Sequence, residues 1–152
     1  MNEREGCEIW GIVEWWLKDA ETDEVLEHGE QRNLIVDQGR GYVQRNMMYD
    51  SPVDPGWIIA TDTATSPSAS EADVPGTNLS AKAATKARPN NTTCRFTCTF
   101  GTGDANGTIK RVGLVGYSGG SSEFCSQQLT NAIVKNDTQS LDVQYDLSIS
   151  WT

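Results

Sequence analysis

The most constraining feature of this chain is a run of alternating apolar and polar residues near its C-terminal end. From Leu141 to Trp151 every odd-numbered position is apolar and every even-numbered position is polar. A β-strand places successive side chains on opposite faces of a sheet, so this period of two predicts a strand with one buried face. Residues 94–100 repeat the pattern, with cysteines and phenylalanines on one face and arginine and threonines on the other. A chain organised in this way is expected to bury its core between sheets.

The first part of the chain predicts a pair of strands. Residues 7–17 alternate less cleanly, because large apolar side chains and carboxylates share the second face. This mixture is typical of a strand that is partly covered on its outer side by a loop or a neighbouring subunit. Residues 19–23 are polar and predict a turn, and residues 25–33 predict a charged return strand. Together they predict an N-terminal β-hairpin over residues 7–33.

A short helix and a long loop are expected next. Asp37 is able to cap a helix, and apolar residues follow it at near-helical spacing, which predicts one short helix over residues 37–48. Residues 61–76 are rich in Thr, Ser, Ala and Pro and predict a long surface loop. Further strands are expected at residues 57–60, 77–87, 94–100, 108–117, 124–129 and 131–135.

The fold class that these segments predict is all-β: an antiparallel β-sandwich or jelly-roll-like fold of about eight strands. A chain of 152 residues suits a single domain. We therefore expect one unit over residues 1–152, in which the hairpin 7–33 and the helix 37–48 precede a sandwich over residues 57–152. The alternating strand is expected to complete the domain, with no anchor or catalytic tail after it.

The charge of the chain argues against several classes of partner. The formal net charge is −9, and such an acidic surface repels phosphates, so no nucleic acid partner is expected. No apolar run approaches the roughly 20 residues that span a bilayer, so no membrane partner is expected. The N-terminal residues are polar and acidic, unlike a secretory signal, which predicts synthesis in the cytoplasm.

Cysteine and histidine usage predicts neither a disulfide nor a metal site. Cys94 and Cys98 share one strand face at a separation of about 13 Å, beyond disulfide reach. The simplest interpretation is that these two, with Cys7 and Cys125, are buried small hydrophobic residues. The single histidine, His28, lies in a charged stretch and is expected to be solvated. No metal or other cofactor is therefore predicted.

Signals for catalysis are weak. Residues 101–107 are glycine-rich, but they lack the Gly-Lys-Ser/Thr ending of a phosphate loop and precede a strand, so they predict a hairpin connection. Calcium ligation by Asp104 and Asn106 is a minor alternative, because a calcium site usually needs more oxygen ligands. No catalytic residue and no enzymatic activity are predicted. Three carboxylates in the long loop are expected to be solvated: Asp62, Glu71 and Asp73.

Tryptophan is the residue type that most suggests an interaction. The chain contains 5 tryptophans, and this side chain suits both cores and interfaces. Trp15 and Trp16 are adjacent, so a strand must point them to opposite faces, and one of them must leave the core. A subunit contact is favoured for such a side chain, and a platform for stacking sugars is the alternative. The candidate subunit or capsid contact residues are Trp10, Trp15, Trp16 and Trp57.

The order of segments resembles a group of small structural proteins of tailed-bacteriophage virions, described as capsid decoration (cement) proteins or tail-associated proteins. The resemblance covers nearly the whole chain, and its motifs mark turns and strands. Two departures are Ala60–Thr65, where a Gly-Thr-Gly-like stretch is common, and Arg111, where glutamate is common. The stretches that carry the resemblance are Asn33–Gly39 (NLIVDQG), Ser70–Gly76 (SEADVPG), Phe100–Leu114 (FGTGDANGTIKRVGL) and Ile133–Tyr145 (IVKNDTQSLDVQY).

The resemblance implies a non-enzymatic subunit that acts as an oligomer, expected to be a homotrimer. We expect a cement subunit on the outer capsid surface of the virion, bound between capsomers to the major capsid protein, where it stabilises the DNA-filled head. An acidic surface suits that location because it is away from packaged DNA. The hairpin 8–31 and the loop 50–76 are the expected contact surfaces. A tail, baseplate or fibre-attachment subunit and a carbohydrate-binding module, with Trp16 or Trp57 as platform, are the alternatives.

Overall fold

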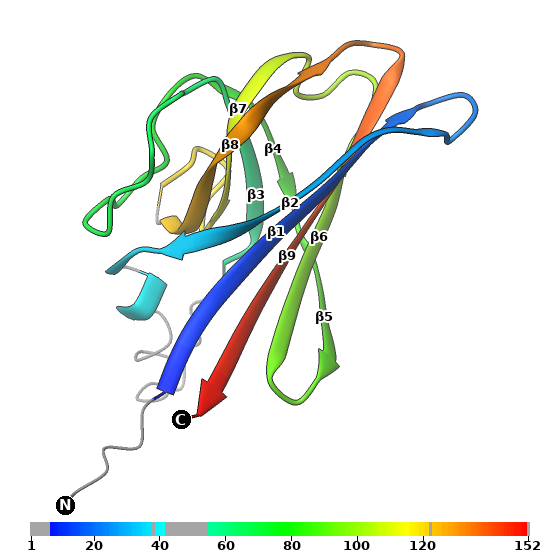
Figure 1. The fold of residues 1–152 in the computed structure, drawn as a ribbon. Coiled ribbons are helices and arrows are strands. Elements are labelled where there is room, and N and C mark those ends of the chain that lie inside the picture. Colours follow the sequence, from blue (N-terminus) through cyan, green and yellow to red (C-terminus); the bar gives the residue numbers. More distant parts are fainter. Residues whose placement is uncertain (1–6, 38, 42–54, 122, 152) are drawn as a thin grey trace, which may run out of the picture.

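The computed structural model describes residues 7–37, 39–41, 55–121 and 123–151 (Figure 1). This part of the chain is almost entirely β-structure, as predicted. All pairs of neighbouring strands are antiparallel. The strands are β1 (Cys7–Asp19), β2 (Val25–Ile35), β3 (Trp57–Thr61), β4 (Asn78–Ala83), β5 (Thr85–Asn90), β6 (Thr93–Phe100), β7 (Gly107–Val115), β8 (Glu123–Lys135) and β9 (Gln139–Trp151).

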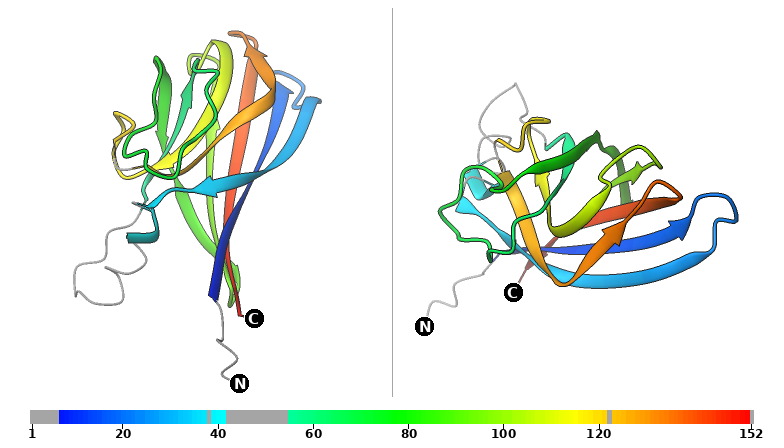
Figure 2. Two further views of the ribbon diagram at one scale, coloured as in Figure 1. Left: turned by 60° about the vertical axis from the view of Figure 1, so that its left-hand side comes forward. Right: turned by 90° about the horizontal axis from the view of Figure 1, so that it is seen from above.

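Strand β2 joins two sheets that face each other. Sheet A has the order β2-β1-β9-β6-β5, and sheet B has the order β4-β3-β7-β8-β2. The first part of β2 pairs with β1, whereas Leu34 and Ile35 at its end pair with Ser126 and Cys125 of β8. Seen from above, the sheets form two layers that meet along this strand (Figure 2). The β-sandwich prediction is confirmed, and the jelly-roll arrangement is not.

The N-terminal hairpin of β1 and β2 lies in the middle of the nine-strand order and forms one side of sheet A. Strand β1 pairs with β9 along its whole length, from Cys7 opposite Trp151 to Asp19 opposite Gln139. The alternating strand β9 is therefore also central, between β1 and β6. Its apolar positions face the core, and its polar positions point away from sheet B. This placement explains the strict period of two, because one face of β9 is packed and the other is not.

The core lies between the two sheets. Its largest apolar members include Phe100, Leu141 and Tyr145, each with 0% of its surface exposed. Burial of one such apolar side chain contributes about 1.5–3 kcal/mol to folding. Trp15 also belongs to this cluster and lies across Gly29 of β2. A Cβ atom at Gly29 would lie 2.1 Å from the indole ring, so only glycine fits opposite Trp15.

Two strand predictions need correction. Residues 77–87 were expected to form one weak strand, but they form β4 and the start of β5, separated in sequence by Ala84. These two strands lie at opposite ends of the nine-strand order. Every residue of β5 is exposed, so the sequence carries no core pattern there. Residues 124–129 and 131–135 were expected to be separate strands, but both belong to β8. Its exposed residues 130–132 interrupt the apolar pattern without ending the strand.

The predicted helix and cysteine positions are confirmed in part. Asp37 and residues 39–41 are helical, and the rest of the predicted helix 37–48 lies outside the described residues. Cys125 is buried and Cys98 packs against the core, where burial raises the pKa of its thiol to about 12. Cys94 is exposed, so the prediction of burial is wrong for it. It lies near the start of β6, where sheet A extends beyond sheet B (Figure 1).

Candidate interaction surface

The outer face of sheet B is covered by the chain itself. Residues 62–77, between β3 and β4, form the predicted long loop and lie over this face (Figure 1). Val74 of this loop is 7% exposed and packs with Ile59 and Val115 in a second apolar cluster. Trp57 packs against the same cluster. The loop therefore closes sheet B from outside, so this face offers little free apolar surface.

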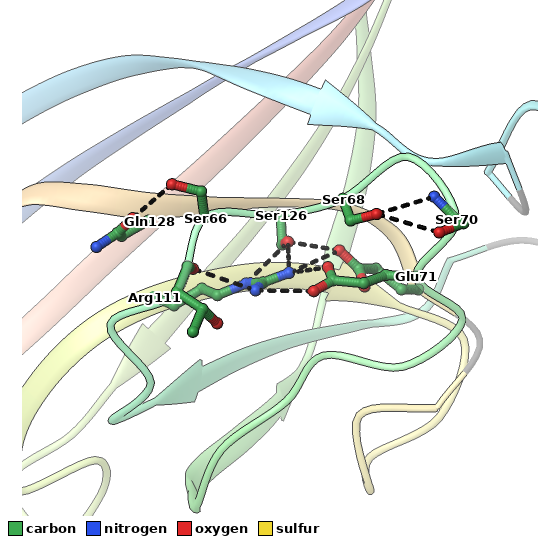
Figure 3. A network of polar contacts seen from close by, with 9 residues as sticks. Ser66, Ser68, Ser70, Glu71, Arg111, Ser126 and Gln128 are labelled. Carbon is green, nitrogen blue, oxygen red and sulfur yellow. Dashed lines mark hydrogen bonds and ion pairs between the residues drawn. The ribbon is translucent and has the colours of Figure 1, made fainter.

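A buried arginine fastens the covering loop to sheet B. Arg111 of β7 is 0% exposed, and its guanidinium donates hydrogen bonds to the Glu71 carboxylate and to the Thr65 carbonyl oxygen at 3.3 Å (Figure 3). On the sheet, it donates to Ser126 Oγ, with Nε at 3.0 Å and Nη2 at 2.6 Å. Glu123 Oε1 lies 3.4 Å from Nη2. We call these five residues the arginine clamp.

The arginine clamp places two carboxylates against one guanidinium. Burial is the main cause that raises the pKa of Glu123, and the neighbouring Glu71 carboxylate adds to it, whereas Ser126 and Arg111 act in the opposite direction. Glu123 Oε2 is buried and accepts no hydrogen bond from the described residues. Two carboxylates against one guanidinium leave an excess negative charge in a buried site, and this cost favours the protonated form of Glu123. The cluster therefore has the properties of a structural clamp.

Other contacts tie the loop along its length. The backbone N–H of Val74 donates to the Gly120 carbonyl oxygen at 3.0 Å, and that of Glu123 donates to Ala72 O at 2.8 Å. Ser66 Oγ donates to Gln128 Oε1 at 2.8 Å. The prediction of solvated loop carboxylates is thus wrong for Glu71. The signal that was missed is Arg111, a charge within the otherwise apolar second half of β7.

The outer face of sheet A differs, because no described segment covers it (Figure 2). The even-numbered residues of β1 point outward here, and Trp10, Ile12 and Trp16 among them are only partly buried. They form an apolar row along β1. We call the side of sheet A that carries this row the open face.

Charged side chains on the open face are paired with one another. Arg95 of β6 binds Asp146 of β9 with two hydrogen bonds of 2.8 Å, and this pairing raises the pKa of Arg95. Lys18 Nζ lies 2.8 Å from Asp142, which also accepts a hydrogen bond from Thr99 at 2.6 Å. Because these charges already have partners, a protein that covers this face would bury fewer unpaired ions, which lowers the cost of binding.

The four candidate tryptophans fall into three environments. Trp10 and Trp16 share the open face, Trp15 is 8% exposed in the core, and Trp57 is partly buried against the apolar cluster of sheet B and its loop. The guanidinium of Arg32 lies 5.9 Å from the ring centroid of Trp10. Trp16 stacks on His28 at 5.3 Å with an interplanar angle of 16°. The adjacent pair Trp15 and Trp16 divides between the two faces as the sequence predicts.

A hollow of about 610 Å³ lies beside Trp16 on the open face. Its charged side chains are Lys18 and Asp142, which pair with each other. The lining residues are Trp16, Lys18, Val25, Thr85, Thr97, Cys98, Thr99, Asp142, Val143 and Gln144. It combines an aromatic ring with hydroxyl, amide and carboxylate groups.

The glycine-rich connection 101–107 encloses an ammonium group of the chain itself. Lys135 is 2% exposed and donates hydrogen bonds to Gly101 O at 2.7 Å and to Asn106 Oδ1 at 2.8 Å. Asp104 pairs with Lys82 at 2.7 Å, which lowers the pKa of its carboxyl group. The oxygens considered for calcium therefore bind lysines. In the described ranges, no three or more His, Cys, Asp or Glu side chains gather as a metal site.

His28 lies on the open face and is exposed, as predicted. Its Nε2 lies 2.9 Å from Glu14 Oε1. In the part of the chain that the structure describes, no helix has the length and apolar character needed to cross a membrane. No protein-family model matches the sequence, and no curated protein or solved structure gives a significant match.

Proposed function

We propose that this protein is a non-enzymatic structural subunit of a tailed-bacteriophage virion, a decoration (cement) protein of the outer capsid surface. Its partners are the major capsid protein and further copies of itself, arranged as a homotrimer. The single observation that carries the proposal is the difference between the two outer faces. Sheet B is closed by its own loop, whereas sheet A presents an uncovered apolar row on a strand that is central to the fold.

The docking surface that we assign is the part of the open face around Trp10 and Ile12, near the start of β1. Arg32 and Glu8 flank this part and are bonded to each other at 2.7 Å. Aromatic and arginine side chains are the types that carry most binding energy in protein interfaces. A subunit that bridges capsomers through interfaces of about 1,600 Å² would oppose the outward pressure of packaged DNA without covalent bonds.

The resemblance in segment order and the β-sandwich fold support a virion role. The acidic charge of −9 fits a surface that lies away from DNA. The described polar clusters serve structural roles, since Arg111 fastens a loop and Lys135 holds a turn. If the test below shows binding to tails and not to capsids, the proposed position becomes a tail-associated one.

Co-sedimentation tests the proposal directly. Purified protein is mixed with capsids that lack it and, separately, with isolated tails of the same virion. We expect saturable binding to capsids and none to tails. We also expect the variant Trp10→Ala to bind capsids at least about tenfold more weakly, because a central tryptophan is removed. Binding to tails alone would overturn the capsid assignment and favour a tail position. Sedimentation velocity of the free protein tests the trimer.

A further inference from the structure

We propose that the hollow beside Trp16 binds a neutral oligosaccharide, with the indole as a stacking platform for a sugar ring. This site is independent of the shell contact assigned to Trp10 and Ile12. Its volume of about 610 Å³ falls within the range of small-molecule sites. It would allow a virion subunit to attach to glycans as well as to a protein shell.

The orientation of Trp16 suits stacking. In sheet A, β2 lies on one side of β1, and β9 followed by β6 lies on the other. His28 of β2 stacks against the indole from the first side. Most of the residues that line the hollow belong to β9 and β6 on the second side, and Val25 of β2 adds to the lining from the first side. His28 therefore supports one face of the indole, and the hollow lies mainly on the side of β1 away from His28.

Polar groups around the indole match the chemistry of a sugar. Asp142 accepts hydrogen bonds from Thr99 and Lys18, and its two carboxylate oxygens have further lone pairs for hydroxyl groups. Thr97 adds a hydroxyl group and Gln144 adds an amide that both donates and accepts. Sugars present hydroxyl groups at their edges and C–H groups on the ring face, which is the pattern that this hollow complements.

The charge of the hollow indicates a neutral ligand. Lys18 and Asp142 contribute opposite charges and lie 2.8 Å apart, so no charge is left over for an ionic ligand. The net charge of −9 also disfavours anionic polysaccharides. The position of Trp16 is fixed before binding, because His28 stacks on it and Glu14 holds His28 at 2.9 Å. Such preorganisation reduces the entropy lost when a ligand binds.

Isothermal titration calorimetry with a panel of neutral oligosaccharides tests the proposal. The probes are cellotetraose, maltotetraose, mannotetraose and N-acetylchitotetraose at millimolar concentration. We expect saturable binding of at least one probe by the full chain. Trp16→Ala should weaken that binding about tenfold or more, because it removes the platform. Arg95→Ala is the matched control, since Arg95 lies on the same face but does not line the hollow.

A second variant separates loss of the site from loss of the fold. Thr97→Tyr keeps Trp16 but fills the hollow from β6, and it should abolish binding while circular dichroism shows an intact β-sheet protein. Loss in both Trp16→Ala and Thr97→Tyr, with binding kept in Arg95→Ala, would support the site. Absence of binding by the unmodified protein, or binding that persists in both variants, would overturn it. Capsid co-sedimentation is measured without sugar, so either proposal can fail alone.

Discussion

The two outer faces of this β-sandwich use the same chemistry in different ways. On sheet B, Arg111 is fully buried and holds a loop against the sheet through Glu71. On the open face of sheet A, Arg95 pairs with Asp146 but retains 37% side-chain exposure. A buried charge that loses its partner is costly, whereas an exposed pair contributes little. Arg111 therefore holds the loop against sheet B, whereas Arg95 belongs to a surface that no described segment covers.

The apolar side chains of the two outer faces also differ in what packs against them. On the sheet B side, Val74 of the covering loop packs against Ile59 and Val115 of the sheet, and Trp57 packs against the same cluster. Trp10 and Ile12 on the sheet A side have the same alternation in sequence but only neighbouring strands beside them. The difference between the two faces is the presence of a covering segment, and it points to sheet A as the side for a partner.

The largest expected effect is the loss of Arg111. Arg111→Ala would remove the guanidinium that binds Glu71, Thr65 and Ser126 and would release the loop, so the free energy of unfolding should fall by about 3–5 kcal/mol. Arg95→Ala is the matched control on the open face and should cost about 0–1 kcal/mol. Urea denaturation of both variants measures this difference. Equal losses of unfolding free energy in the two variants would contradict the distinction between the buried arginine clamp and the exposed pair of Arg95 and Asp146.

The packing of the loop is tested at a glycine beneath it. A Cβ atom at Gly113 would lie 2.7 Å from Val74 Cγ2 and 3.3 Å from Ile59 Cγ2. Gly113→Ala should therefore lift the loop and destabilise the protein by about 1–3 kcal/mol. Gly103→Ala, where a Cβ atom meets nothing within 4 Å, should change stability by less than about 0.5 kcal/mol. Similar melting temperatures for the two variants would show that the loop does not press on sheet B.

A smaller effect should appear in the pH dependence of the clamp. The folded protein raises the pKa of Glu123 above its ordinary value of 4.5, mainly by burial. Folding therefore favours the protonated form, whose contribution is complete below pH 4.5 and is lost as the pH rises through the folded pKa. Glu123→Gln keeps a neutral side chain at every pH. The stability of the unmodified protein relative to this variant should fall as the pH rises, and parallel stability curves would contradict the assignment.

The smallest effect on stability is expected on the open face. Trp10→Ala removes a partly exposed ring and its contact with Arg32, so the free energy of unfolding should fall by about 1 kcal/mol or less. The same variant should bind capsids at least about tenfold more weakly. Thermal melting and co-sedimentation of one preparation give both values. A large loss of stability with unchanged binding would reverse the roles assigned to the two faces.

Local patterns in the sequence were sufficient for the strands that form the core. The period of two in residues 141–151 and 94–100 predicted which side chains face inward, and it separated Trp15 from Trp16. The clamp was not predictable in this way, because Glu71 and Arg111 are 40 residues apart in sequence. The environment of Trp57 depends on the same loop and was missed for the same reason. The division between β4 and β5 was missed because exposed edge strands need no apolar pattern.

Cryo-electron microscopy of capsids to which the purified protein has been added is the most direct test of the central claim. We expect density at local threefold positions between capsomers, with the part of the open face around Trp10 and Ile12 against the shell. The loop that covers sheet B should point away from these contacts. Density only on tails would contradict the capsid assignment. Subunits on the shell that contact it through the loop of sheet B would contradict the distinction between the two faces.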